Sequence, residues 1–250
     1  MSYTPTQSTD RWVTAAITVP LILGHLAVFL ARGSQVTLAA YMLGYVASLL
    51  AAATSKKFRH LLIIPAAGFA IGLVAEIAGV NTGVPFGRYE YLSLRAPRLL
   101  GVPITVPIMW GFYSYLTYLV ASSIIRRGGI LKVLYTSTLM VLLDLAMDPF
   151  MVNVVHAWTW LSGWGPKWFG IPASNFTGWF IVSAAIIATH ELTQGNAPTP
   201  NTKALTIPYV TLTIFFTTYI GPNLTGPIAA ATTALIAIPA TLTNKTPQTT

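Results

Sequence analysis

Three carboxylic acids stand within or at the end of apolar segments, in a chain that has only six acidic residues among 250. Glu76 lies in GLVAEIAG, and Asp144 and Asp148 lie in LLDLAMDPF. A spacing of four places both aspartates on one helix face, and Pro149 is expected to end the regular helix just after them. A helix C-terminus, an apolar layer and neighbouring like charges all disfavour ionisation. At least one acid is therefore expected to be protonated near neutral pH, and a neutral carboxylic acid is a proton donor.

Aromatic and small polar residues accompany these acids along the sequence. The stretch HAWTWLSGWGPKWFGIP is rich in tryptophan, and VNTG, FGRYEY and SNFTGWF flank the acidic segments. Aromatic faces stabilise cations, so these rings are candidates to flank a cationic carbon, and the polar side chains are candidates to orient water. The candidate binding residues are Asn81, Thr82, Tyr89, Tyr91, Trp110, Trp158, Trp160, Asn175 and Trp179. Trp164 and Trp168 are interpreted instead as part of an interfacial aromatic belt.

The histidines do not form a recognisable metal site. None of the four has metal-ligand spacing, and the absence of cysteine excludes disulfides and thiolate sites. His156 alone lies near the acids in sequence, whereas His190 and Glu191 are expected to form a solvated helix end. No Walker phosphate loop and no GxSxG motif occurs. We therefore predict neither a metal nor a cofactor.

Composition indicates that these residues lie in a membrane. Hydrophobic residues make up 54% of the chain and charged residues 8%, whereas a soluble domain is roughly a quarter charged. Long apolar runs, each near the ~20 residues that a span requires, predict an all-α fold, a polytopic membrane helical bundle. About eight helices are predicted, or seven if Gly221 and Pro222 do not interrupt the last one. The predicted ranges are 12–31, 36–53, 61–79, 104–125, 131–147, 176–192, 205–220 and 223–243.

The chain is expected to form a single transmembrane domain over residues 1–250, without an internal repeat. Polar tails at about 1–10 and 244–250 are expected to be disordered. The net charge of +8 indicates contact with anionic membrane lipids. No basic run with interleaved aromatic residues suggests nucleic acid, and the oligomeric state is unknown.

Basic residues set the expected orientation. The loops TSKKFRH and IIRRGGILK fall on one side, which the positive-inside rule makes cytoplasmic. Eight spans then place both termini in the cytoplasm and segments 80–103 and 148–175 outside the cell membrane. Helices 3 and 5 run toward the same face, so Glu76, Asp144 and Asp148 should converge in one layer of the membrane.

Four motifs occur in a characteristic order: EIAGVNTGVPFGRYEY, GVPITVPIMW, DLAMDP with WTW, and FGIPASNFTGW. In this order they resemble the carotenoid hydratase family of integral membrane proteins, which includes bacterial carotenoid 1,2-hydratases and archaeal bisanhydrobacterioruberin hydratases. The resemblance is densest over about residues 70–180. It implies a hydro-lyase that adds water to the terminal double bond of an acyclic carotenoid, with no redox cofactor and no obvious metal. The implied partners are a lipid-soluble carotenoid substrate and membrane lipids.

Hydration of such an alkene without a metal calls for protonation to a tertiary carbocation, followed by capture of water. We assign proton donation to Asp148 or Asp144. The partner carboxylate, or Glu76, would position and deprotonate the water.

Other functions fit parts of the same pattern. A membrane prenyltransferase would use the DxxxD pair for magnesium and diphosphate, although such enzymes usually need a second acid-rich motif. A lycopene or terpene cyclase starts from the same protonation but then loses a proton. A proton-coupled transporter or channel also uses buried carboxylates, and a purely structural or pigment-binding role is a further alternative.

Overall fold

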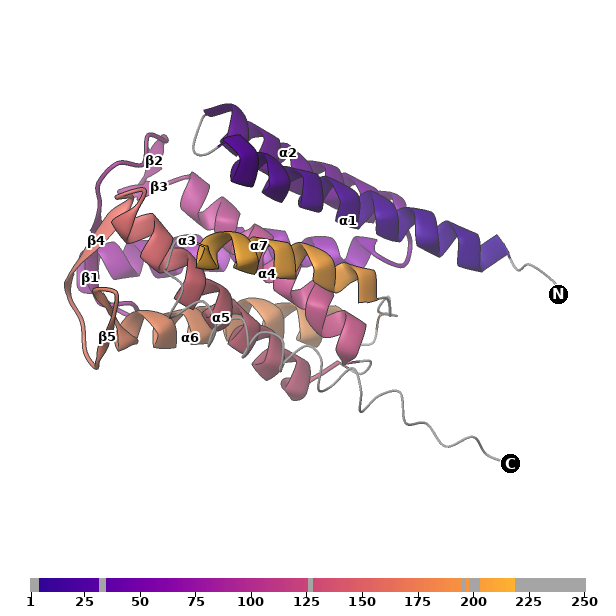
Figure 1. The fold of residues 1–250 in the computed structure, drawn as a ribbon. Coiled ribbons are helices and arrows are strands. Elements are labelled where there is room, and N and C mark those ends of the chain that lie inside the picture. Colours follow the sequence, from indigo (N-terminus) through magenta and orange to yellow (C-terminus); the bar gives the residue numbers. More distant parts are fainter. Residues whose placement is uncertain (1–4, 32–34, 126–127, 195–196, 198–202, 219–250) are drawn as a thin grey trace.

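The computed structural model describes residues 5–31, 35–125, 128–194, 197 and 203–218. Within these ranges the chain forms a bundle of helices, with short strands gathered at one end (Figure 1). The helices are α1 (Pro5–Ala31), α2 (Gln35–Thr54), α3 (Ile63–Thr82), α4 (Thr105–Ile124), α5 (Ile130–Asn153), α6 (Ala173–Gln194) and α7 (Ile207–Thr217). Short 3-10 helices, η1 (Arg59–Leu62) and η2 (Lys203–Thr206), precede α3 and α7.

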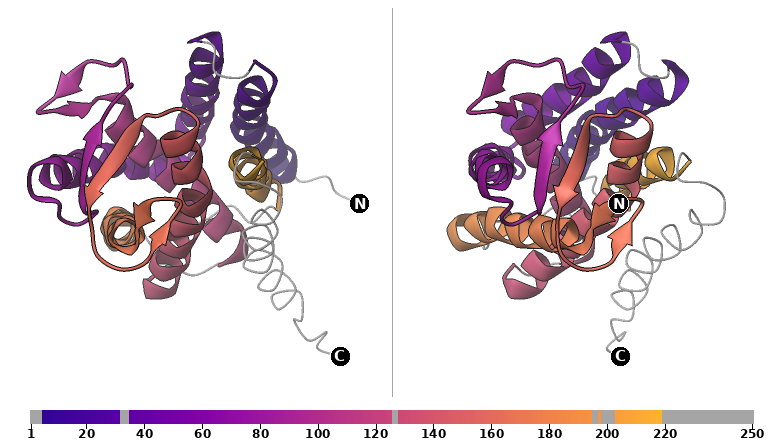
Figure 2. Two further views of the ribbon diagram at one scale, coloured as in Figure 1. Left: turned by 60° about the vertical axis from the view of Figure 1, so that its left-hand side comes forward. Right: turned by 90° about the vertical axis from the view of Figure 1, so that its left-hand side faces the viewer.

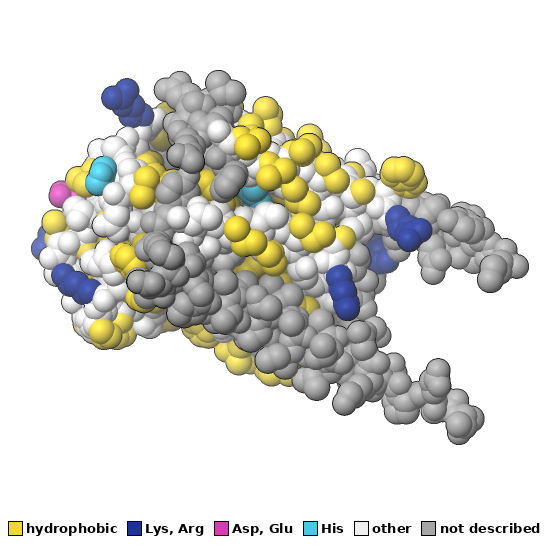
Figure 3. Space-filling model, viewed as in Figure 1, with side chains coloured by type: hydrophobic (Ala, Val, Ile, Leu, Met, Phe, Trp, Pro, Cys, Tyr) yellow, Lys and Arg dark blue, Asp and Glu magenta, His cyan; other side chains and the backbone are white. Residues whose placement is uncertain are grey.

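The predicted all-α membrane bundle is confirmed. Three described segments are long and apolar enough to cross a membrane: Arg59–Thr82, Ile130–Asn153 and Ala173–Gln194. On the face shown in Figure 3, hydrophobic side chains predominate along the bundle, and Lys and Arg side chains lie toward its two ends. Such extensive apolar exposure is typical of a surface that contacts lipid. The predicted helix at 223–243 lies outside the described residues.

Two predicted helix boundaries differ from the structure by six or seven residues, and the other described boundaries differ by three or fewer. Helix α1 begins at Pro5, so residues 5–10 are helical and do not belong to a disordered tail. The prediction that Pro149 ends the fifth helix is wrong, because α5 continues to Asn153.

Trp168 explains how α5 tolerates its proline. A proline has no N–H to donate to the carbonyl four residues earlier, here that of Leu145. The indole Nε1 of Trp168 donates to this carbonyl at 3.0 Å and replaces the missing bond. Trp168 therefore supports the bundle, whereas Trp164 is 62% exposed, as expected of a belt residue.

The segments that follow α3 and α5 meet across one end of the bundle. Figure 2 shows their strands lying over the ends of the helices, in the view where that end faces the reader. These strands were not predicted from the sequence. The antiparallel pairs are β1 (Arg88–Tyr91) with β4 (Trp158–Ser162), β2 (Arg98–Leu99) with β3 (Val102–Pro103), and β5 (Lys167–Trp168) with β6 (Ile171–Pro172).

The chain contains an internal repeat, contrary to our expectation from the sequence. An offset of 69 residues relates the β2–β3 hairpin to the β5–β6 hairpin, which have the same register. The same offset relates Leu100 to Phe169, whose φ angles are 50° and 52°. It also relates two backbone hydrogen bonds, from Ile104 N to Pro97 O at 2.9 Å and from Ala173 N to Pro166 O at 3.0 Å. Two equivalent units, α3–β1–β2–β3–α4 and α5–β4–β5–β6–α6, therefore follow one another along the chain.

A pseudo-two-fold rotation relates these units. In the β1–β4 pair, Glu90 lies opposite Thr159, its own equivalent, and Tyr89 lies opposite Trp160, the equivalent of Tyr91. The equivalent rings of Trp110 and Trp179 stack with their centroids 4.3 Å apart. Both units lead into the same end of the bundle, so the repeat is parallel and not inverted.

Glycine allows α3 and α4 to approach closely. Gly68, Gly72 and Glu76 follow one another at intervals of four on a buried face of α3. A Cβ atom at Gly68 would lie 2.5 Å from the Cα atom of Gly111, and one at Gly72 would lie 2.7 Å from the Cβ atom of Trp110. Small residues at such an interface let helix backbones come together in a membrane. Here they bring Trp110 beside Glu76.

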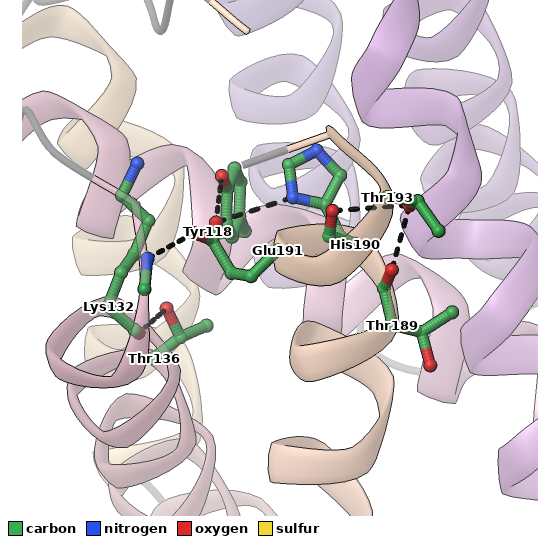
Figure 4. Close-up of polar contacts among 8 residues, drawn as sticks. Tyr118, Lys132, Thr136, Thr189, His190, Glu191 and Thr193 are labelled. Atoms are coloured by element: carbon green, nitrogen blue, oxygen red, sulfur yellow. Dashed lines mark hydrogen bonds and ion pairs between the residues drawn. The ribbon is translucent and has the colours of Figure 1, made fainter. Parts of the chain in front are cut away.

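At the opposite end, His190 is buried and Glu191 is partly buried, with only 4% of the Glu191 side chain exposed, so the prediction of a solvated helix end is wrong. Glu191 Oε1 accepts from the Tyr118 hydroxyl at 2.6 Å, and its Oε2 accepts from the backbone N–H of Gly129 at 2.5 Å (Figure 4). The His190 ring packs edge-on against Tyr118 with centroids 4.6 Å apart. The ammonium of buried Lys132 lies 5.1 Å from the centre of the same tyrosine ring. These contacts tie the end of α6 to α4 and to the start of α5.

The substitution Gly72→Val should lower the free energy of unfolding by about 1–3 kcal/mol, because the new side chain overpacks the core against Trp110. Denaturation of the purified protein in detergent measures this change. Ala70→Val is the control, since Ala70 lies on the exposed face of α3 and receives the same side chain. Equal stability of the two variants would contradict the close packing of α3 on α4.

Candidate active site

A cavity of about 660 Å³ lies between the helices and is bounded at one side by the β1–β4 sheet. Its lining comes from α2 to α7 and from both strands, and the described residues that line it include no lysine, arginine or histidine. Exposed Val154 and Val155 lie at its rim. Nine predicted site residues line it: Glu76, Tyr89, Tyr91, Trp110, Asp148, Trp158, Trp160, Asn175 and Trp179.

Glu76 projects from α3 into this cavity and accepts three hydrogen bonds. Its Oε2 accepts from the hydroxyl of Tyr89 and, at 2.5 Å, from that of Tyr91. Its Oε1 accepts from the indole Nε1 of Trp110 at 2.8 Å. All three donors are neutral. Among the described residues, no arginine of the neighbouring loop forms an ion pair with Glu76. The donors to Glu76 depend on both units of the bundle, because β1, which carries Tyr89 and Tyr91, pairs with β4 of the second unit.

The two tyrosines act as donors to Glu76. Burial, reinforced by the adjacent Glu76 carboxyl group, raises the pKa of Tyr89 and of Tyr91 above the usual value. Both phenols therefore keep their protons over the ordinary pH range and continue to donate. The chemistry of the site must accordingly assign proton exchange to other groups.

Asp144 and Asp148 converge on one amide. Asn175, in the first turn of α6, donates through Nδ2 to Asp144 Oδ2 at 2.8 Å and to Asp148 Oδ2 at 2.7 Å. All three side chains are buried, but only Asp148 and Asn175 line the cavity. Asp144 lies behind them, and its Oδ1 has no hydrogen-bond partner among the described residues. Of the two aspartates, Asp148 therefore faces the cavity and Asp144 is buried outside its lining.

Aromatic rings form the wall around the acids. Trp110 and Trp179 stack on each other. Trp110 bonds Glu76 through its Nε1, and Trp179 lies one helical turn after Asn175 on α6. Tyr89 packs against Trp160 with centroids 5.9 Å apart, and Tyr91 packs edge-on against Trp158 at 6.1 Å. Such faces attract a cation that comes within about 6 Å.

Three residues considered from the sequence lie away from the acids. Asn81 and Thr82 bond carbonyls of their own helix, those of Ile77 and Ala78, and both side chains are exposed. Neither lines the cavity. His156 is exposed in the turn before β4. The structure therefore brings none of the three to the acids.

The sequence analysis did not identify Tyr41 of α2 and Tyr113 of α4, which both line the cavity. A signal existed for Tyr113, because it follows Trp110 by three residues and so shares its helix face. The position of Tyr41 could not be predicted, since nothing in the sequence of α2 indicates that this helix packs beside α4. Residues of α7, including Phe215 and Phe216, were missed for the same reason.

Comparison with protein families matches residues 36–241 to the family described as carotenoid biosynthesis protein. Over 116 residues the chain is 28% identical to bisanhydrobacterioruberin hydratase of Haloarcula japonica. This match covers 45% of the chain and 38% of that relative, so the chain aligns with less than half of the other protein. No solved structure matches the chain.

The substitution Asn175→Ala should lower the free energy of unfolding by about 1–3 kcal/mol, because it leaves two buried carboxyl groups without their shared donor. Asn81→Ala is the matched control, since that amide is exposed and bonds its own helix. Denaturation of both variants in detergent gives the comparison. Equal losses would show that the amide does not support the aspartate pair.

Proposed function

Because the chain belongs to the carotenoid biosynthesis protein family, we propose that it is a carotenoid hydratase, a hydro-lyase that adds water to the terminal double bond of an acyclic carotenoid. One observation carries the proposal: buried carboxyl groups stand at an apolar, aromatic cavity without basic residues among its described lining. Such a wall suits a polyene, and carboxylic acids supply the proton that an alkene requires. The name of the similar Haloarcula japonica protein supports the same class of reaction.

In this proposal Asp148 donates the proton. Two carboxyl groups that share one amide in an apolar setting retain a proton between them, because both cannot carry a full charge. Asp148 faces the cavity and Asp144 does not. The O–H bond of Asp148 breaks, the π electrons of the terminal double bond form a new C–H bond, and a tertiary carbocation remains.

Glu76 stays ionised and compensates the charge of this cation. Three donors converge on its oxygens, and the indole of Trp110 can only donate. Hydrogen bonds of this kind favour the carboxylate over the acid. A fixed anion stabilises a developing cation strongly where water is excluded. The faces of Trp110 and Trp179 contribute in the same direction.

Water then closes the cycle. Its oxygen forms the C–O bond with the tertiary carbon, and its surplus proton returns to the Asp148 carboxylate. The product is a tertiary alcohol, and the acid ends in the form in which it began. No electron changes hands, so the reaction needs no redox cofactor.

The membrane supplies the substrate. A long polyene partitions into the bilayer, and the rim at Val154 and Val155 offers apolar side chains to a molecule that enters laterally between helices. We assign the cytoplasmic side of the cell membrane to the basic loop between α2 and α3, with Lys56, Lys57 and Arg59. With eight spans both termini are then cytoplasmic and the β1–β4 sheet faces outward.

The cavity favours this reaction over prenyl transfer. A DxxxD pair that holds magnesium and diphosphate must present both aspartates to the substrate, but Asp144 does not line the cavity, and the described lining offers no lysine or arginine. A cyclase shares the protonation step, so the mass of the product separates it from a hydratase.

Expression in a host that makes acyclic carotenoids tests the proposal. The chain should yield a pigment heavier by one water for each modified end, with an unchanged visible spectrum because the conjugated chain is intact. Asp148→Asn and Glu76→Gln should each lower the yield by roughly a hundredfold or more. Mass spectrometry and absorption of the extracted pigments provide the measurement.

Glu90→Gln is the matched control. Glu90 is exposed on the same strand as Tyr89 and Tyr91, so its loss should leave hydration unchanged. An unmodified pigment in cells that contain folded wild-type protein would overturn the carotenoid assignment. A pigment of unchanged mass but with rings at its ends would indicate a cyclase.

A further inference from the structure

A pair of tyrosine hydroxyls stands at the cavity apart from the donors that bind Glu76. Tyr41 of α2 and Tyr113 of α4 both line the cavity, and their hydroxyl oxygens lie 3.3 Å apart. Both side chains are buried. Burial of two phenols in an apolar region is costly unless their hydroxyl groups form hydrogen bonds. The pair therefore needs a further hydrogen-bond partner.

The direction of the bond leaves one proton free. Tyr41 donates to Tyr113, so the oxygen of Tyr113 is an acceptor in this bond and its own hydrogen is directed elsewhere. No carbonyl or side chain in the described part of the chain accepts that hydrogen. Tyr113 lines the same cavity as Asp148, and it stands one helical turn beyond Trp110, which donates to Glu76.

The other hydroxyls of the cavity are committed or more distant. Those of Tyr89 and Tyr91 donate to Glu76, and that of Tyr41 donates to Tyr113. Thr105 also lines the cavity, but it stands eight residues before Tyr113 on α4, about 12 Å along the helix axis. Among the described residues that line the cavity with Asp148, Tyr113 is thus the hydroxyl with a free hydrogen.

We infer that Tyr113, oriented by Tyr41, binds the water molecule that adds to the carbocation; this inference rests on the hydratase function proposed above. A buried water needs two to four polar partners. Tyr113 donates to the water oxygen, and the water donates one hydrogen to Asp148. This leaves a lone pair of the water for the tertiary carbon.

The arrangement accounts for each proton of the addition. The hydrogen of Asp148 has moved to the alkene, so its carboxylate can accept a hydrogen from the bound water. As the C–O bond forms, the O–H bond of the water breaks toward Asp148, and Tyr113 keeps its own proton. Without a positioned water, the cation can only return a proton to Asp148 and re-form an alkene.

This competition provides a test. Membranes that contain the protein and an acyclic carotene are incubated in D₂O, and mass spectrometry measures deuterium in both the alcohol and the recovered carotene. Protonation followed by proton loss introduces deuterium into the carotene without hydration. In Tyr113→Phe, hydration should fall by about tenfold or more while exchange persists, so the ratio of exchange to hydration should rise by a similar factor. Tyr41→Phe should raise the ratio in the same direction but less.

Tyr115→Phe is the matched control. Tyr115 is also buried on α4, but its hydroxyl bonds Ser48 and it does not line the cavity. Its ratio should equal that of the wild type. An unchanged ratio in both Tyr113→Phe and Tyr41→Phe would overturn the water-binding role while leaving the hydratase function intact. Wild-type membranes that neither hydrate nor exchange would instead overturn the proposed function itself.

Discussion

Burial of three carboxyl groups in an apolar bundle is the constraint on which the rest of the structure depends. An isolated charge in such surroundings is too costly to persist, so each acid needs partners fixed in place. Glu76 obtains them from Tyr89, Tyr91 and Trp110, and the two aspartates share Asn175. The glycine face of α3 brings Trp110 into position, the β1–β4 sheet brings both tyrosines, and the first turn of α6 brings Asn175.

The internal repeat explains how one cavity holds two kinds of acid. Its two units have a common frame, but their polar residues differ at equivalent places. By the offset of 69 residues, Glu76 corresponds to Leu145 and Asp148 corresponds to Gly79. A Cβ atom at Gly79 would lie 2.8 Å from the hydroxyl of Tyr89, so the first unit cannot carry an acid there without losing a donor to Glu76. The first unit thus supplies an acid surrounded by three donors, and the second supplies two acids that share the amide of Asn175.

The helical framework and most of the site were predictable, because apolar length and the spacing of acids are local properties of the sequence. Nine of the predicted residues line the cavity, since the acidic helices run toward the same end of the bundle. Other features depend on contacts between distant segments. The β1–β4 pairing joins loops about 70 residues apart, Trp168 replaces a hydrogen bond lost at Pro149, and Tyr41 reaches the cavity from α2. The covering of the Glu191 side chain likewise depends on Tyr118 and on the turn at Gly129, which the sequence of α6 does not reveal.

We propose that an ionised Glu76 and an aspartate pair that retains a proton act together, with Glu76 and Asp148 facing one cavity. Infrared spectroscopy of the purified protein in a detergent without ester groups tests it directly, because only protonated carboxyl groups of the protein then give the carboxylic-acid C=O band. We expect this band in the wild type and in Glu76→Gln, and we expect it to disappear in the double variant Asp144→Asn, Asp148→Asn. A band that disappears in Glu76→Gln and persists in the double variant would contradict the assignment of donor and counter-charge.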